Sequence, residues 1–193
     1  PLRLVGSEMC IRDRLLADSR LTAQQTQNMR LFISGSAPLL AETHEEFTRR
    51  TGHHILERYG MTETSMITSN PLNGERRPGT VGTALADVEI TIIDPETGQK
   101  KATGEIGGIE VRGPNVFKGY WNMPDKTELE LRENGYFITG DLGKFCSDGY
   151  LSIVGREKDL IISGGYNVYP KEVEDILNTV SYTHLTLPTN REV

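Results

Sequence analysis

The sequence predicts an α/β fold that is followed by a group of short antiparallel strands. A strand, a loop, a helix and a second strand can be assigned in that order over residues 30–58, and this order is typical of α/β sheets. After residue 70, short apolar runs alternate with Gly and Pro turn signals, a pattern typical of a β-barrel-like subdomain. The chain has 193 residues, which is enough for one domain or for parts of two.

The first elements follow from apolar spacing and from turn residues. Residues 30–34 predict a buried strand that runs into a loop of small residues at 35–38. Residues 39–51 carry apolar side chains at helical spacing, and Gly52 ends that helix. Residues 54–58 predict the next strand. Because ligands of α/β sheets bind beyond the carboxyl ends of strands, the segments that follow these two strands are candidate site residues.

The later elements are short strands joined by turns. Gly and Pro residues between positions 71 and 82 mark a long loop. Helices are expected over residues 124–132 and 170–180. The runs that predict strands are residues 88–93, 107–112, 136–141, 150–154 and 159–163.

Both ends of the chain differ from the rest. Residues 1–14 show neither helical nor strand periodicity, and in residues 181–193 a Thr-rich run interrupts a helical pattern. Both segments resemble translated sequencing-adapter sequence at the ends of assembled metagenomic proteins; the alternative is a flexible tag or tail. We therefore expect a non-native leader at 1–14 and a non-native tail at 181–193.

Composition and charge exclude several classes of protein. Hydrophobic residues make up 36% and charged residues 25% of the chain, as in globular proteins. The net charge is −6 and the basic residues are scattered, so no nucleic-acid partner is expected. No apolar run is long enough to span a membrane. Cys10 and Cys146 lack zinc-type spacing, which favours a reducing compartment and a cytoplasmic location.

Residues 57–64, Glu-Arg-Tyr-Gly-Met-Thr-Glu-Thr, are the most informative segment. Within five positions they supply an aromatic ring at Tyr59, a glycine turn at Gly60, a hydroxyl at Thr62 and a carboxylate at Glu63. A nucleotide site needs such groups: a flat face for a base, close backbone approach, a donor for a phosphate oxygen and an oxygen ligand for Mg²⁺. The segment therefore indicates a nucleotide site.

Together with Thr139-Gly140-Asp141 and residues 155–159, this segment resembles the motifs of the acyl-adenylating superfamily. That superfamily includes acyl-CoA synthetases, peptide-synthetase adenylation domains and firefly luciferase, and the chain is most similar to its malonyl-CoA synthetase group. The motifs occur in the family's order over nearly all of residues 15–180. The resemblance implies that residues 15–157 are the C-terminal part of the large AMP-binding domain. It implies that residues 158–180 are the hinge and the start of the small C-terminal domain.

The resemblance assigns a nucleotide site. The residues that it implies are Gly35, Ser36, Ala37, Pro38, Tyr59, Gly60, Met61, Thr62, Asp141 and Arg156. Residues 35–38 match the loop against the adenine, and Tyr59 matches the ring that stacks on it. The alternatives are a plain strand-to-helix turn and a core tyrosine.

Thr62 and Glu63 match the residues that contact the α-phosphate and Mg²⁺, and they are the implied catalytic groups. The alternative is a helix N-cap at Thr62 with Glu63 complementing the helix dipole. Asp141 matches the carboxylate that accepts both ribose hydroxyls, and Arg156 contacts the ribose. The alternatives are an Asp in an ordinary turn and a surface ion pair of Arg156 with Glu157.

Three further positions match the moving parts of the family. Lys158 falls on the hinge, where the small domain pivots, and it is assigned with the catalytic residues. Gly164 and Gly165 match the loop that approaches the thiol acceptor; the alternative is a hairpin turn. Arg58 matches a residue suited to the second carboxylate of a dicarboxylate substrate, because Arg binds carboxylates bidentately. Its alternative is a strand-end Arg directed to solvent.

The implied function is that of an AMP-forming acid–CoA ligase. A carboxylate attacks the α-phosphorus of ATP to give an acyl-adenylate, and coenzyme A then displaces AMP, with Mg²⁺ offsetting charge in the first step. The expected substrates are ATP, coenzyme A and a small dicarboxylate such as malonate or methylmalonate. The sequence gives no indication of oligomeric state.

The chain is expected to be a fragment. The family's phosphate loop and the catalytic lysine of its small domain have no counterpart in residues 15–180, so the chain alone is expected to be inactive. The alternatives are a mono-acid CoA ligase, an adenylation domain that serves a carrier protein, a non-catalytic nucleotide-binding module and a purely structural fragment.

Overall fold

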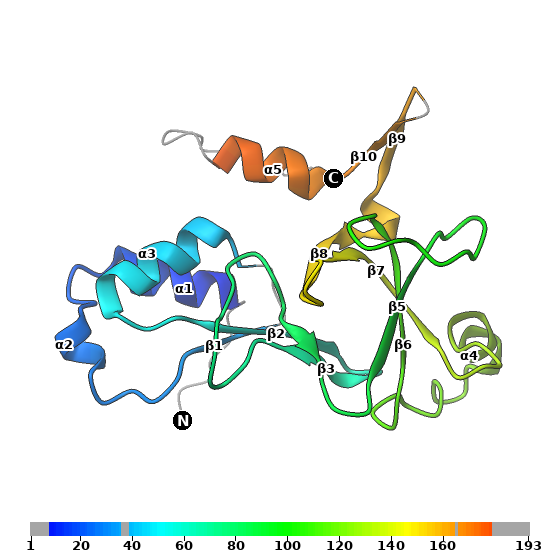
Figure 1. Cartoon of the computed structure of the whole chain (residues 1–193), viewed down its shortest axis with the longest axis horizontal. Coiled ribbons are helices and arrows are strands. Elements are labelled where there is room, and N and C mark those ends of the chain that lie inside the picture. The colour runs from blue at the N-terminus through cyan, green and yellow to red at the C-terminus, as the bar shows by residue number, and fades with distance from the viewer. Residues whose placement is uncertain (1–7, 36–38, 165, 179–193) are drawn as a thin grey trace, which may run out of the picture.

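The structure, a computed structural model, describes residues 8–35, 39–164 and 166–178. Within these residues, the N-terminal half of the chain forms a mixed sheet with three helices (Figure 1). The C-terminal half forms a second sheet that is wholly antiparallel, then a two-stranded sheet and a helix. In these ranges, no helix has the length and apolar character needed to cross a lipid bilayer.

The first sheet and its helices come from the N-terminal half. The elements are α1 (Glu8–Ala17), α2 (Ala23–Thr26), β1 (Ile33–Ser34), α3 (Ala41–Thr51), β2 (Leu56–Met61), β3 (Ser65–Ser69) and β4 (Thr83–Ala84). The strands pair in the order β1-β2-β3-β4, with β1 and β2 parallel and the others antiparallel. Phe47 of α3 packs with Leu39 and Ile55 in a small apolar core. Gly52, at a φ of 75°, ends α3 as the sequence predicts.

The second sheet is an antiparallel meander in the order β5-β6-β7-β8. The elements of the C-terminal half are β5 (Glu89–Ile93), β6 (Gly107–Arg112), α4 (Pro124–Glu130), β7 (Phe137–Phe145), β8 (Leu151–Arg156), the 3₁₀ turn η1 (Glu157–Asp159), β9 (Ile161–Ser163), β10 (Tyr166–Val168) and α5 (Pro170–Asn178). Strands β9 and β10 form a separate two-stranded sheet, and α5 follows it (Figure 1).

One apolar cluster joins the two larger sheets. Its fully buried members are Ile67, Ile92, Ile109, Val111 and Leu151. Ile67 lies on β3 of the first sheet, whereas the others lie on β5, β6 and β8. The backbone of Leu151 also pairs with Val81 and Gly82 through two hydrogen bonds of 2.8 Å. These contacts fix β3, and therefore the β2 strand paired with it, against the second sheet.

Three expectations about local structure need correction. Residues 8–14 carry no helical periodicity, yet they lie in α1. Strand β2 continues through Tyr59 and Gly60 to Met61, because a β-bulge between Tyr59 and Gly60 keeps the strand paired with β3. Strand β7 likewise continues to Phe145, so it does not end at the polar residues near 140.

Candidate active site

The predicted motif folds as a β-hairpin. Tyr59 and Gly60 lie on β2, residues 62–64 make the turn, and β3 returns alongside. A side chain at Gly60 would bring its Cβ within 2.1 Å of the backbone oxygen of Ser65. Glycine is therefore required for the close approach of β3, and the expected glycine turn is wrong, because Gly60 lies within β2. The helix N-cap alternative for Thr62 is wrong, because no helix begins there.

Tyr59 and Asp141 meet across the two sheets. The Tyr59 hydroxyl donates a hydrogen bond of 2.5 Å to Oδ2 of Asp141, and Nε of Arg156 lies 2.7 Å from Oδ1. Asp141 and Arg156 are direct partners in the register of β7 and β8, which brings the guanidinium beside the carboxylate. The alternative pairing of Arg156 with Glu157 is wrong, because Arg156 pairs with Asp141. The alternative of a turn aspartate is also wrong, because Asp141 lies inside β7.

The surroundings of Asp141 make its carboxylate rigid and partly desolvated. Asp141 is 5% exposed, and its backbone N–H donates to the hydroxyl of Thr139 at 3.1 Å. Burial raises the pKa of Asp141 above its ordinary value, although the Tyr59 hydrogen bond and the Arg156 charge oppose this shift. Burial, with the neighbouring Asp141 charge and hydrogen bond, also raises the pKa of Tyr59, so the phenol keeps its proton at neutral pH. A fixed carboxylate with lone pairs left over suits a vicinal diol.

Glu63 is held by a loop that the sequence did not identify as part of the site. Its backbone oxygen accepts a hydrogen bond of 2.7 Å from the N–H of Phe117, and its Oε1 lies 3.1 Å from the hydroxyl of Tyr120. Asn115 donates to the backbone oxygen of Thr64 at 2.7 Å. The nearest sequence signal was the run Lys118-Gly-Tyr-Trp-Asn122, which is typical of an ordinary loop.

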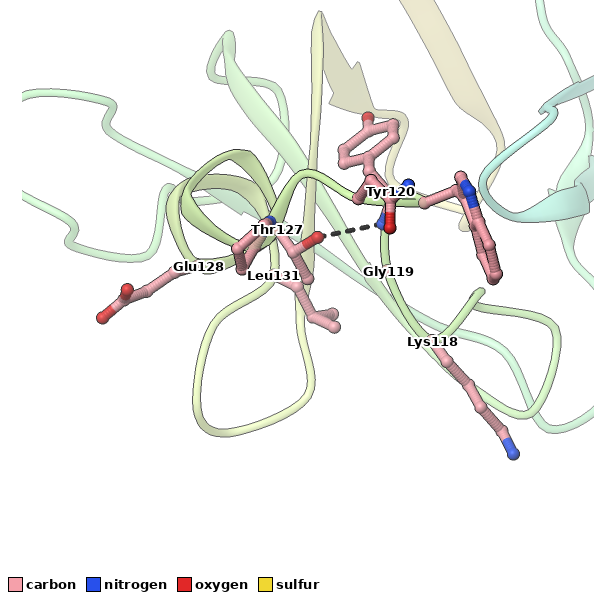
Figure 2. Close-up of a pocket in the computed structure, with 9 residues that line it drawn as sticks. Lys118, Gly119, Tyr120, Thr127, Glu128 and Leu131 are labelled. Atoms are coloured by element: carbon pink, nitrogen blue, oxygen red, sulfur yellow. Dashed lines mark hydrogen bonds between the residues drawn. The ribbon is translucent and has the colours of Figure 1, made fainter.

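A pocket of 610 Å³ lies between residues 118–122 and α4 (Figure 2). The backbone N–H of Tyr120 donates to the hydroxyl of Thr127 at 2.9 Å, which ties this loop to the helix. The lining residues all fall between positions 118 and 131, and none of the predicted site residues is among them. The pocket therefore lies beside the candidate site rather than in it.

Glu63 offers a single carboxylate, which is compatible with a metal ion of the magnesium type. Among the described residues there is no group of three or more His, Cys, Asp or Glu side chains that could hold a metal ion by itself. Mg²⁺ usually binds through one or two carboxylates and completes its shell with substrate phosphates and water. The half-buried carboxylate of Glu63 beside an exposed Thr62 is compatible with that kind of site.

The remaining predicted residues are distributed over three places. Arg58 has an exposed side chain, and a Cβ added to Gly35 would lie 3.4 Å from its Cγ. The end of β1 therefore lies beside the first half of β2, because β2 continues to Met61. Lys158 is exposed in η1. Gly164, at a φ of 59°, follows β9 directly in the chain, before β10 begins, which agrees with the hairpin alternative. Ser36, Ala37, Pro38 and Gly165 lie outside the described residues.

Comparison with known proteins shows one family. The family model described as "AMP-binding enzyme" matches residues 8–121. A long-chain-fatty-acid–CoA ligase of Bacillus subtilis is 40% identical over 164 residues, which are 84% of this chain and 29% of that protein. A malonate–CoA ligase of Arabidopsis thaliana is 43% identical over 166 residues, 86% of this chain and 26% of that protein. The chain thus spans between a quarter and a third of the length of these relatives.

Solved structures of similar sequence have a similar fold. ATP-bound MatB from Rhodopseudomonas palustris is 60% identical, with a TM-score of 0.87 over 89% of this chain and 34% of that one. A malonyl-CoA ligase in a ternary product complex with methylmalonyl-CoA and AMP is 43% identical, with a TM-score of 0.66 over 89% of this chain and 36% of that one. The architecture described above is therefore found in solved proteins of high sequence identity.

Proposed function

The chain belongs to the AMP-binding enzyme family, and we propose on that basis that the whole protein containing it is an AMP-forming acid–CoA ligase. The observation that carries the proposal is the contact of Tyr59 and Arg156 with the two oxygens of Asp141. It supplies an aromatic ring, a fixed carboxylate and a cation at one place, which suits a base and its ribose. Location in the cytoplasm is part of the proposal.

The proposed reaction has two steps. An oxygen of the substrate carboxylate forms a bond to the α-phosphorus of ATP, and the bond from that phosphorus to pyrophosphate breaks. The sulfur of coenzyme A then bonds to the acyl carbon, AMP leaves, and the thiol proton passes to solvent. Binding and orientation of the reacting groups account for most of what the protein contributes in such a transfer.

The residues of the β2–β3 hairpin would orient the phosphates. Thr62 is exposed in the turn, so its hydroxyl is available to an α-phosphate oxygen, and Glu63 would hold Mg²⁺. When bound, Mg²⁺ offsets the negative charge of the phosphates. Gly60 and Met61 extend β2 up to this turn, and they would support the nucleotide through the backbone. Gly35, which follows β1 directly, would lie against the adenine.

The substrate is proposed to be a small dicarboxylate such as malonate or methylmalonate. Arg58 is exposed one position before Tyr59, where its permanent charge could pair with a second carboxylate. The malonate–CoA ligase of Arabidopsis thaliana and the malonyl-CoA ligase solved with methylmalonyl-CoA and AMP support this choice. The long-chain-fatty-acid–CoA ligase of Bacillus subtilis, at 40% identity, favours a mono-acid substrate as the second candidate.

The domain assignment supports a reaction with two conformations. Residues 15–157 are proposed to belong to the large domain, and residues 158–180 to the hinge and the start of the small one. The separate pairing of β9 with β10 supports a boundary near Lys158. Gly164 and Gly165 would then approach the thiol acceptor after a hinge motion. The 193-residue chain alone is proposed to be inactive.

Product analysis tests this function. The whole protein is incubated with ATP, Mg²⁺, coenzyme A and one acid at a time: malonate, methylmalonate, acetate or a long-chain fatty acid. The proposal expects AMP, pyrophosphate and malonyl-CoA or methylmalonyl-CoA, with acetate and the fatty acid as poor substrates. Formation of ADP, or of no acyl-CoA with any acid, contradicts the proposal. A clear preference for the fatty acid supports the second candidate.

A further inference from the structure

We propose that Tyr120 is a positioning residue for Glu63 and that α4 is the support that holds Tyr120 in place. The inference rests on the proposed function, because it takes Glu63 as the residue that would hold Mg²⁺. It concerns a loop and a helix to which the motifs of the sequence assign no role.

The loop before α4 holds Glu63 at two points. The Tyr120 hydroxyl lies 3.1 Å from Oε1 of Glu63, so it contacts the carboxylate. The N–H of Phe117 donates to the backbone oxygen of Glu63 at 2.7 Å, so it fixes the main chain. The rings of Phe117 and Tyr120 pack edge to face, with centroids 4.8 Å apart. The two anchors therefore form one unit.

Helix α4 holds both the backbone and the side-chain hydroxyl of Tyr120. The backbone N–H of Tyr120 donates to Oγ1 of Thr127 at 2.9 Å, and its hydroxyl donates to Oε2 of Glu130 at 2.5 Å. Nζ of Lys126 lies 4.1 Å from the centroid of the ring, where a cation is attracted to the π face. Figure 2 shows the Tyr120 ring directed away from Lys118 and Leu131, and its dashed line marks the hydrogen bond of the Tyr120 backbone with Thr127.

The contacts of the Tyr120 hydroxyl favour a role in orienting Glu63. A phenol carries one proton, and two carboxylate oxygens lie within reach of it. The contact of 2.5 Å with Glu130 is shorter than the contact of 3.1 Å with Glu63, so Glu130 accepts the stronger hydrogen bond from the phenol. Glu63 is thereby held in one orientation by a contact with its Oε1.

The expected change in metal affinity can be taken from other groups that orient a metal ligand. Groups that orient a metal ligand, without touching the metal, typically change metal affinity by about 10–100-fold when they are removed. Replacing Tyr120 by Phe removes the hydroxyl and keeps the ring that packs against Phe117 and under Lys126. The fold therefore retains most of its contacts in the Tyr120→Phe variant.

Tyr136 supplies a matched control. Its hydroxyl lies 3.1 Å from Oε2 of Glu89, and the guanidinium of Arg112 lies 4.6 Å from its ring centroid. It thus has the same acceptor type as Tyr120 and also has a cation over its ring, although that cation is an Arg rather than a Lys. Glu89 is exposed on β5 and has no predicted role. The Tyr136→Phe variant reports the effect of losing a phenol hydroxyl in general.

The experiment measures binding of Mn²⁺, which stands in for Mg²⁺, to the whole protein with saturating ATP, by the paramagnetic resonance signal of free Mn²⁺. In Tyr120→Phe we expect the dissociation constant for Mn²⁺ to rise about tenfold or more, and in Tyr136→Phe to stay within twofold. Binding of AMP without metal is expected to stay within twofold in both variants, which separates positioning of Glu63 from a general loss of structure.

Two results overturn the inference alone. One is a wild-type protein that binds Mn²⁺ with ATP together with a Tyr120→Phe variant of unchanged affinity. The other is a Tyr120→Phe variant that loses metal-free AMP binding to the same extent as Mn²⁺ binding. A wild-type protein that binds no Mn²⁺ in the presence of ATP contradicts the proposed function as well, so the two failures are distinguishable.

Discussion

The hydroxyl of Tyr59 lies 2.5 Å from Oδ2 of Asp141, although the two residues are 82 positions apart. Tyr59 belongs to β2 of the mixed sheet and Asp141 to β7 of the antiparallel one. The bond therefore links the ring proposed to stack on the base with the carboxylate proposed to bind the ribose. Binding of the base and binding of the ribose should therefore be coupled, and a substitution at Tyr59 should weaken binding of the ribose by Asp141.

Replacing Tyr59 by Phe tests this coupling, because Phe keeps the ring and removes the hydroxyl. Hydrogen bonds to charged groups contribute roughly 1.5–3 kcal/mol, so we expect AMP affinity to fall about tenfold or more. The affinity for 2′-deoxy-AMP, which uses Asp141 less, should fall less. Calorimetry of the whole protein with both ligands measures the ratio. Equal losses for the two ligands would show that Tyr59 acts on the base alone.

Asp141 should stabilise the folded protein less at neutral pH than at acidic pH, although its charged form serves binding. Its pKa in the folded protein is raised by burial above the ordinary value, so the stability it contributes is fully present below the unfolded pKa. That contribution is lost as the pH rises through the folded pKa. We therefore expect the melting temperature of Asp141→Asn, relative to that of the wild type, to increase between pH 3 and pH 7.

The measurement compares thermal unfolding of the two proteins at each pH, so that titration of other groups cancels. Asp141→Asn should also weaken binding of adenosine, whose uncharged ribose diol depends on the carboxylate. A relative melting temperature that decreases as the pH rises would mean that Arg156 and Tyr59 outweigh burial at this carboxylate.

Gly60 and Gly155 form a matched pair for the packing of the hairpin. A Cβ at Gly60 would lie 2.1 Å from the Ser65 backbone oxygen and 2.5 Å from Cε of Met66, whereas a Cβ at Gly155 meets nothing within 4 Å. We expect Gly60→Ala to lower the free energy of unfolding by about 1–3 kcal/mol, as overpacking does. Gly155→Ala should raise it slightly, by at most about 1 kcal/mol. Urea unfolding of the two variants checks this, and effects of equal size and sign would contradict the account.

Arg58 should determine the choice between dicarboxylate and mono-acid substrates. Replacing it with Leu removes a charged partner of the second carboxylate, so kcat/KM for malonate should fall about 10–100-fold. The value for acetate should change by less than threefold. Arg49→Leu, which removes an exposed Arg paired with Glu46 on α3, is the control and should affect neither acid. A parallel loss for malonate and acetate in Arg58→Leu would assign Arg58 to the nucleotide or to the fold.

Much of the site could be predicted because its residues occur in short motifs with a fixed order. Tyr59, Asp141 and Arg156 were named from such motifs, and the register of β7 with β8 brings two of them together. The direct bond between Tyr59 and Asp141 could not be predicted, since it depends on how β3 packs against the second sheet. Periodicity cannot give that packing, because it reports which face is buried and not what covers it.

The boundaries of elements and the support of the site were harder to predict. Strand β2 extends past Tyr59 because of a bulge, which is a feature of pairing rather than of composition. Helix α1 has no apolar stripe that would reveal it. Tyr120 lies 57 positions from Glu63 in a loop of ordinary composition, so only the folded chain shows their contact.

The transfer of oxygen from the acid to AMP tests the central claim most directly. The whole protein is incubated with ATP, Mg²⁺, coenzyme A and malonate labelled with ¹⁸O in its carboxylates, and the AMP is analysed by mass spectrometry. Attack of the carboxylate on the α-phosphorus predicts one ¹⁸O atom in each AMP formed. Unlabelled AMP, or label that appears in phosphate together with ADP, would contradict the account.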